Sequence, residues 1–359
     1  MPHQGRLLSD RNSPLTPCTL TDLGWSDRFA RQLTEDDAAF IAARISEVHR
    51  SQLIALSEAG DLRLIPTESA GAYAVGDWVL TDGTSAIRRL DPVTTLHRKA
   101  AGHAVSDQRI AANVDTVGLV TSCNADFNVA RLERYLALAL ASNAVPLVIL
   151  TKADLCDDPD SFKRKAERLS PLVTAITINA KDPEDVARLN AWCSKAQTLA
   201  LLGSSGVGKT TLRNALTGEK EATQDIRDDD AKGRHTTTHR ALRRTLAGGW
   251  LIDTPGMREL QLSGTSDGLE ELFDDIEALA AQCKFSNCAH ASEPGCAVKA
   301  ALADGALDPA RLERWQKLRR EDQYNSESIA AARARQKSFG RVVKEVMSTK
   351  SRYKRGYED

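Results

Sequence analysis

The sequence has almost no net charge. Its 48 Lys and Arg residues nearly cancel its 49 Asp and Glu residues, which leaves a formal charge of −1 over 359 residues. No whole-chain field therefore draws the protein to nucleic acid, and any such binding must come from local patches. Apolar residues make up 42% and charged residues 27%, which is typical of globular domains and not of disordered chains. At roughly 150 residues per domain, the length predicts two or three domains.

The sequence also has no long apolar run. The most apolar stretch, residues 136–150, is interrupted by Ser142, Asn143 and Pro146 and is shorter than the roughly 18–20 residues that a membrane-spanning helix needs. The first residues, MPHQGRLLSDRNSP, lack the apolar core of a signal peptide. The seven cysteines are an odd number, which favours a reducing compartment over a disulfide framework. We expect a cytoplasmic protein that does not bind membranes.

The hydrophobic pattern changes three times along the chain. Residues 1–40 are polar and predict a mostly loose N-terminal arm, in which Leu23-Gly24-Trp25 docks onto the next domain. Short apolar runs between Gly and Asp turns predict an OB-like β-barrel over residues 41–105. Apolar runs that alternate with helical segments predict an α/β domain with a mostly parallel sheet over residues 106–264. Residues 265–359 have a helical pattern that a Cys/His cluster interrupts.

Within the α/β domain, the pattern places each element. The expected strands are residues 114–122, 145–154, 173–180, 198–202, 241–249 and 250–256. The expected helices are residues 129–141, 161–170 and 182–196, and the last of these begins with the N-cap Asp182 and a proline. We find no internal repeats.

A glycine-rich segment between an expected strand and a helix matches the G-x-x-x-x-G-K-[ST] pattern of phosphate loops. Its residues are Gly203, Ser204, Ser205, Gly206, Val207, Gly208, Lys209 and Thr210, followed by Thr211. Glycines let backbone N–H groups turn inward around phosphates, and the helix adds the positive end of its dipole. Lys209 would reach the β- and γ-phosphates, and Thr210 would bind Mg²⁺ through its hydroxyl. The segment predicts a nucleoside triphosphate site.

Three further segments, each at the end of an expected strand, predict a guanine nucleotide. Thr151-Lys152-Ala153-Asp154 resembles the N/T-K-x-D guanine reader, in which Asp154 accepts hydrogen bonds from guanine N1–H and the 2-amino group. Asn179-Ala180-Lys181 resembles the S-A-K turn, whose backbone N–H meets guanine O6. Asp253-Thr254-Pro255-Gly256 matches D-x-x-G, so Asp253 suits Mg²⁺ and Gly256 N–H suits the γ-phosphate. Adenine would leave the carboxylate of Asp154 buried and unpaired, at a cost of several kcal/mol.

The order of these segments is rotated relative to ordinary GTPases. The guanine readers at residues 151–154 and 179–181 precede the phosphate loop, whereas ordinary GTPases begin with that loop. We therefore expect a circularly permuted sheet, with every segment at its carboxyl edge, where nucleotides bind. The segment after D-T-P-G then leads directly into the C-terminal domain. A movement of this segment with the state of the γ-phosphate can therefore be transmitted directly to that domain.

Four metal-ligating residues lie within fourteen positions. Cys283, Cys288, His290 and Cys296 have the spacing C-x4-C-x-H-x5-C. Three thiolates and one imidazole fill a tetrahedral Zn²⁺ shell and leave no position open for water, which predicts one structural zinc per chain. A disulfide or free thiols are the alternatives, and the expected compartment disfavours the disulfide. The remaining cysteines are scattered and predict packing or surface thiols.

Together these motifs resemble those of the ribosome-small-subunit-dependent GTPases, which are circularly permuted bacterial factors of late 30S assembly. The resemblance covers nearly the whole chain and also includes GRHTTTH at residues 233–239. It implies GTP and GDP binding with Mg²⁺, hydrolysis of GTP that the 30S subunit stimulates, and contact with 16S rRNA through the barrel and the zinc domain. We expect a monomer. Thr151 stands where the family often has Asn, and this shorter side chain predicts a modest loss of base affinity.

The water-activating group is not evident, because Met257 follows D-T-P-G where Ras-like enzymes have Gln. His235 is our candidate, since it adjoins Thr236, Thr237 and Thr238 in a polar loop and a near-neutral pKa suits proton transfer. The alternatives for His235 are RNA contact or packing. We expect one of Thr236, Thr237 and Thr238 to bind Mg²⁺; the sequence leaves open which of the three does so, and Thr237 is our candidate.

Two basic segments and two rival functions stay open. The expected barrel ends in a basic segment that contains Arg88, Arg89, His97, Arg98 and Lys99. This segment is either a solvated edge or a nucleic-acid-binding face. Residues 333–355 contain nine Lys or Arg and one acid, and they form either a solvated helix or an rRNA-binding tail. One rival to the GTPase is an RNA-binding adaptor that holds GTP with negligible turnover. The other is a small-molecule kinase, which explains neither the guanine readers nor the flanking domains.

Overall fold

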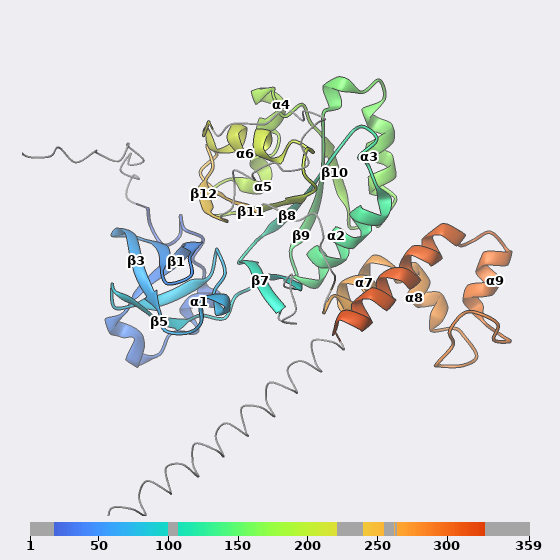
Figure 1. Ribbon diagram of the computed structural model, residues 1–359, viewed down its shortest axis with the longest axis horizontal. Coiled ribbons are helices and arrows are strands. Elements are labelled where there is room, and N and C mark those ends of the chain that lie inside the picture. Colours follow the sequence, from blue (N-terminus) through green and yellow to red (C-terminus); the bar gives the residue numbers. More distant parts are fainter. Residues whose placement is uncertain (1–17, 100–106, 221–239, 255–261, 263, 327–359) are drawn as a thin grey trace, which may run out of the picture.

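The computed structural model describes residues 18–99, 107–220, 240–254, 262 and 264–326. Three parts follow one another along the chain: a β-barrel, a central sheet with helices, and a group of C-terminal helices (Figure 1). Among the described residues, no helix is both long enough and apolar enough to cross a membrane.

Five short strands close into the barrel. They are β1 (Ile41–Val48), β2 (Leu53–Ser57), β3 (Gly60–Pro66), β4 (Trp78–Thr81) and β5 (Ser85–Arg89), in the order β1-β2-β3-β5-β4. Alternate residues of the strands point inward, as the strand period of two requires. Ala43 and Ile45 of β1 thereby meet Leu53 and Ala55 of β2 in the barrel core. The expected small barrel is confirmed.

Residues 18–40 pack against the barrel. They contain α1 (Asp27–Ala30) and the 3-10 helix η1 (Glu35–Ala39), and both Leu23 and Phe29 are buried. The rings of Trp25 and Trp78 meet edge-on with centroids 4.8 Å apart. The expected docking of this segment is therefore confirmed. The expectation of a loose arm is wrong for residues 18–40, because their apolar side chains cover the barrel.

A two-stranded antiparallel sheet joins the barrel to the central sheet. It consists of β6 (Thr95–Lys99) and β7 (Asp107–Ala112), while the 3-10 helix η2 (Ala70–Ala72) lies before β4. Arg109 of β7 binds the fully buried Asp77 through two hydrogen bonds of 2.8 and 2.9 Å, which ties this sheet to the barrel. Arg88 pairs with Asp37, so part of the expected basic face is already neutralised.

The central sheet has six strands in the order β10-β9-β8-β11-β13-β12. They are β8 (Thr116–Ser122), β9 (Val145–Thr151), β10 (Thr174–Thr177), β11 (Thr198–Gly203), β12 (Leu242–Arg244) and β13 (Trp250–Asp253). All neighbours are parallel except β12, which runs antiparallel to β13. The expected mostly parallel sheet is confirmed.

Both faces of the sheet are buried, which explains the continuous apolar runs of its strands. Leu199 and Leu201 of β11 pack with Leu212 of α6 (Lys209–Thr217) on one face. Ala200 and Leu202 point to the other face, toward α2 (Val129–Ala141). Helix α2 has the expected bounds, because Asn128 caps it by accepting a hydrogen bond from Arg131 N–H.

The helix expected over residues 182–196 divides into two. It forms α4 (Pro183–Ala187) and α5 (Asn190–Cys193), while α3 (Pro159–Glu167) agrees broadly with the expected helix over residues 161–170. Helix α5 ends where Ser194 becomes extended and forms a β-bridge with Gly248. This contact with the turn before β13 prevents the helix from continuing to residue 196.

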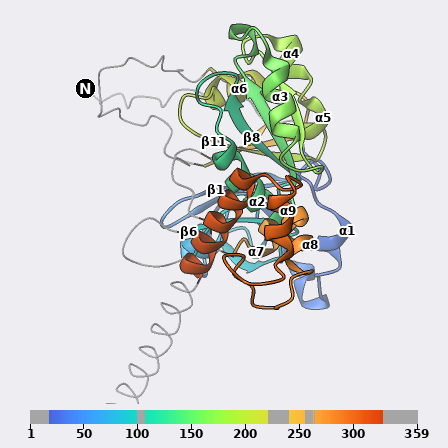
Figure 2. The same ribbon diagram turned by 90° about the vertical axis from the view of Figure 1, so that its right-hand side faces the viewer.

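The C-terminal part docks on α2 (Figure 2). Its helices are α7 (Ser266–Leu272), α8 (Asp274–Ala280), α9 (Ala297–Ala303) and a helix over residues 309–326. At Gly268 of α7 a Cβ atom would lie 2.1 Å from Ala137 O of α2, so only glycine permits this close approach. The fully buried carboxylate of Glu133 also accepts a 2.7 Å hydrogen bond from Arg314. The C-terminal part is therefore held on the helix that follows β8.

Candidate functional site

The predicted phosphate loop connects β11 to α6 at the carboxyl edge of the sheet. Gly206 and Gly208 have φ values of +83° and +91°, which favour glycine. At Gly203 a Cβ atom would lie 2.3 Å from Val120 O of the neighbouring strand. Ser205 and Gly206 are exposed at the tip of the loop. The glycines of the motif are thus required by the backbone path itself.

Lys209 folds over the loop that precedes it. Its Nζ donates hydrogen bonds to Gly203 O at 2.7 Å and to Ser204 O at 2.5 Å. The ammonium group is therefore fixed above the backbone that would surround the phosphates, while Thr210 and Thr211 follow in the first turn of α6.

Thr151, at the end of β9, joins the predicted guanine-reading segment to the predicted phosphate loop. The residue is fully buried, and its hydroxyl lies 3.0 Å from Thr121 O of β8 and 2.5 Å from Val207 O of the loop. A hydroxyl has one hydrogen to share between these two acceptors, whereas the amide of the more usual Asn has two. Thr in place of Asn at this position therefore changes how the loop is hydrogen-bonded to the neighbouring strands.

The two predicted guanine-reading segments lie next to each other. Lys152 adopts a left-handed conformation with φ of +58°, and Ala153 N–H donates to Ile178 O immediately before Asn179. The side chain of Asn179 accepts a 3.0 Å bond from Lys181 N–H, which shapes the turn around Ala180. Asp154 is exposed at this edge. Asp154 can distinguish guanine from adenine only if its carboxylate is shielded from water, and a bound base would have to provide that shielding.

Asp253 ends β13 beside the phosphate loop. It is 5% exposed, and its Oδ1 has no hydrogen-bond partner among the described residues. Burial raises the pKa of Asp253, while the positive charges of Arg213, Lys209 and Arg243 oppose that rise. A buried carboxylate oxygen without a partner suits a hydrated Mg²⁺ ion, so the residues present fit this metal.

One contact of the loop was not predicted from the sequence. Ser204 Oγ donates to Asp126 Oδ2 at 3.1 Å, and Arg131 of α2 pairs with the same carboxylate at 2.8 Å. Asp126 follows β8 at the carboxyl edge, so its place after a buried strand was the available signal. The contact links the phosphate loop to the helix that carries the C-terminal part.

Some predicted residues lie outside the described part of the chain. These are His235, Thr237 and Gly256, together with Thr236, Thr238, Met257 and the basic segment 333–355. Their predicted roles stay predictions.

The three cysteines and the histidine come together in the C-terminal part. One ligand atom from each of Cys283, Cys288, His290 and Cys296 lies within 4.8 Å of all the others. Cys283 Sγ is 3.8 Å from Cys296 Sγ, and both lie 3.5–3.6 Å from His290 Nδ1. These separations are too long for a disulfide and fit four ligands around one tetrahedral ion at Zn–S distances of about 2.3 Å. The residues present therefore fit zinc.

The loop between the ligands is ordered by one carboxylate. Glu293 accepts hydrogen bonds of 2.9–3.0 Å from the backbone N–H groups of Ala289, Ala291 and Ser292. These bonds, led by that of Ala289, lower the pKa of Glu293 to about 2. The ring of Trp315 lies against His290 with centroids 5.7 Å apart. The metal ligands are thus supported by neighbours on both sides.

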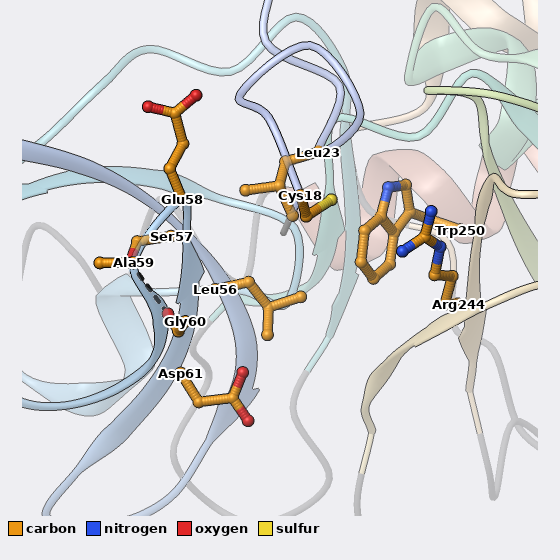
Figure 3. A pocket seen from close by; sticks show the side chains of 10 residues that line it. All are labelled: Cys18, Leu23, Leu56, Ser57, Glu58, Ala59, Gly60, Asp61, Arg244 and Trp250. Carbon is orange, nitrogen blue, oxygen red and sulfur yellow. Dashed lines mark hydrogen bonds between the residues drawn. The ribbon is translucent and has the colours of Figure 1, made fainter. Parts of the chain in front are cut away.

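A small pocket lies elsewhere, between the barrel and the edge of the central sheet (Figure 3). It measures about 170 Å³, and its walls include the β2–β3 turn, Arg244 and Trp250. Trp250 begins β13, so the pocket is at the amino edge, opposite the phosphate loop. None of the described site residues lines it.

Comparisons with known proteins agree with this arrangement. The RsgA GTPase family model matches residues 90–263. Small ribosomal subunit biogenesis GTPase RsgA 2 of Vibrio parahaemolyticus is 48% identical over 341 residues, which are 94% of this chain and 95% of that protein. Small ribosomal subunit biogenesis GTPase RsgA of Mesorhizobium japonicum is 49% identical over 331 residues, covering 90% and 95%.

Two solved structures share the fold. YjeQ from Thermotoga maritima has a TM-score of 0.55 at 24% identity, over 78% of this chain and 97% of that one. YloQ, a circularly permuted GTPase, has a TM-score of 0.54 at 23% identity, over 84% and 98%. The sheet order around the phosphate loop, the Cys/His cluster and the identity over almost the whole length lead to one conclusion. The chain belongs to the RsgA family of circularly permuted GTPases.

Proposed function

We propose that this protein hydrolyses GTP to GDP and phosphate while bound to the small ribosomal subunit, during late maturation of that subunit. The observation that carries the proposal is the meeting of residues 151–154, 179–181 and 203–211 at one carboxyl edge of the sheet. The names of the relatives, which are small ribosomal subunit biogenesis GTPases, supply the partner.

In this proposal, the base binds between two turns. The carboxylate of Asp154 accepts from guanine N1–H and the 2-amino group, the stem of Lys152 covers the ring, and a backbone N–H of residues 179–181 meets O6. The adjacency of the two segments, through Ala153 N–H and Ile178 O, supports this arrangement.

The phosphates bind along the loop of residues 203–211. Backbone N–H groups and Lys209 hold the β- and γ-phosphates, while the hydroxyls of Thr210 and Thr237 and the carboxylate of Asp253 hold hydrated Mg²⁺. Magnesium, when bound, neutralises the charge that develops on the phosphates. Gly256 N–H meets the γ-phosphate. His235 orients the attacking water.

The flanking domains hold the ribosomal subunit. One Zn²⁺ at Cys283, Cys288, His290 and Cys296 stabilises the C-terminal part, which contacts 16S rRNA together with the barrel, mainly through backbone and shape. The protein acts as a monomer in the cytoplasm, where bacterial ribosomal subunits mature.

Phosphate release from GTP, measured on purified protein with and without 30S subunits, tests this function. We expect slow release alone and much faster release with 30S subunits. His235→Ala should keep GTP affinity and lose most of the stimulated turnover, whereas Lys209→Ala should lose nucleotide binding itself. Binding to 30S subunits without stimulated release would favour the adaptor. Preference for ADP over GDP would favour a small-molecule kinase.

A further inference from the structure

A fully buried arginine lies behind the phosphate loop. Arg213 is 0% exposed and sits on α6, one helical turn after Lys209. Residues four apart share a face of a helix, and the positive charges of both Arg213 and Lys209 act on Asp253 at the end of β13. A buried guanidinium is stable only where its charge is compensated, and the sequence motif does not require an arginine at this position.

The compensating group is Asp253. Arg213 NH1 lies 3.2 Å from Asp253 Oδ2, and Arg213 NH2 donates to Asn214 Oδ1 at 3.1 Å. The pair is almost completely shielded from solvent, with side-chain exposures of 0% and 7%. One carboxylate oxygen is thus engaged by the arginine, while Oδ1 has no partner among the described residues.

We propose that Arg213 is a positioning residue, which holds the carboxylate of Asp253 so that Oδ1 faces the magnesium side of the phosphate loop. This inference rests on the proposed function. A guanidinium is planar and permanently charged, so it fixes the orientation of the carboxylate, whereas Lys209 has a flexible stem that suits phosphates. Arg213 thereby prevents Asp253 from turning to Lys209 and leaves each cation a separate anionic partner.

A second arginine near Asp253 provides a matched control. Arg243 of β12 contributes positive charge at Asp253, but its guanidinium binds Glu219 at 2.6 Å. Removal of Arg243 therefore also removes a positive charge that acts on Asp253, but it removes no bond to the carboxylate.

The test is the rate of release of a fluorescent GDP analogue, measured as Mg²⁺ is varied. Magnesium should slow release from the wild-type protein. In Arg213→Met, the Mg²⁺ concentration that gives half the maximal slowing should rise about 10–100-fold, as for other groups that orient the contacts of a metal. In Arg213→Lys this Mg²⁺ concentration should rise less than in Arg213→Met, and in Arg243→Met it should resemble that of the wild type.

A comparison of double variants keeps the inference testable even if Arg213→Met folds poorly. If the arginine acts through Asp253, Arg213→Lys should raise the required Mg²⁺ in the wild-type background and have no further effect in Asp253→Asn. An equal effect in both backgrounds, or wild-type Mg²⁺ dependence in Arg213→Lys and Arg213→Met, would overturn the inference. Failure of the wild-type protein to bind the GDP analogue would instead contradict the proposed function.

Discussion

Arg44 of the barrel binds Thr198 of the central sheet: Arg44 NH2 lies 2.9 Å from Thr198 Oγ1. The guanidinium is buried, and it also donates to Leu23 O at 2.6 Å and to Asn113 O at 2.9 Å. Thr198 begins β11, and the other end of that strand is Gly203 of the phosphate loop. The N-terminal segment, the barrel and the strand that leads into the predicted phosphate loop thus share one buried cation.

Replacement of Arg44 should weaken this junction. Burial lowers the pKa of Arg44 to about 10, so the group stays charged at neutral pH. Arg44→Met would leave several buried oxygen acceptors without donors, and we expect a loss of about 2–4 kcal/mol in the free energy of unfolding. Urea unfolding measures this loss of stability. Arg63→Met, at an exposed barrel position, is the control; equal stability of the two variants would contradict the role of Arg44.

Thr151 offers a test of how the phosphate loop is attached. Thr151→Val keeps the shape of the side chain but removes the hydroxyl that reaches Thr121 O and Val207 O. We expect a loss of about 1–3 kcal/mol in stability, together with weaker GDP binding because the loop loses its link to β9. Titration with a fluorescent GDP analogue and urea unfolding check this. Thr151→Ser retains the hydroxyl and should behave like the wild type, and GDP binding unchanged in Thr151→Val would refute the argument.

Metal removal should act on the C-terminal part. Metal analysis of the purified protein should find about one zinc per chain. A strong chelator should unfold the region around residues 283–296, because the free energy of zinc binding stabilises the folded form of that region. Cys288→Ser should lower the zinc content, whereas Cys156→Ser, which is distant in sequence from the cluster, should not. Well under one zinc per chain in the wild-type protein would exclude the assignment.

The N-terminal segment should show a pH-dependent stability. Asp37 accepts hydrogen bonds from Thr34 N–H and the Thr34 hydroxyl and pairs with Arg88. The Thr34 bonds, helped by Arg88, hold the pKa of Asp37 below its ordinary value. A lowered folded-state pKa means that this stabilisation is complete above the unfolded pKa of about 4 and is lost as pH falls further.

Thermal unfolding of Asp37→Ala checks the sign. Its Tm should be lower than that of the wild type at pH 7, and the difference should shrink as pH falls below about 4. Asp36→Ala, at an exposed neighbour, should change Tm little at either pH. A difference for Asp37→Ala that is as large at pH 3 as at pH 7 would argue against the ionised carboxylate.

The sequence predicts local features better than distant pairs. Helix α2 was predicted with its observed bounds of residues 129–141, which the Asn128 cap fixes locally, and the Cys/His spacing located the metal cluster. The split between α4 and α5 was missed, because it depends on the bridge between Ser194 and Gly248. Thr198, a partner of Arg44, is 154 residues away from it, and Asp253, the ion-pair partner of Arg213, is 40 residues away. Only the folded sheet brings such residues together.

Competition binding tests the central claim, that the segments at the carboxyl edge form a guanine-nucleotide site with Asp154 as the base reader. GDP should displace a fluorescent GDP analogue, while ADP should bind at least about 100-fold more weakly. Asp154→Ala should lose most of this preference, and the exposed neighbour variant Asp157→Ala should keep it. ADP that competes as well as GDP, or an Asp154→Ala variant with the full wild-type preference, would contradict the account.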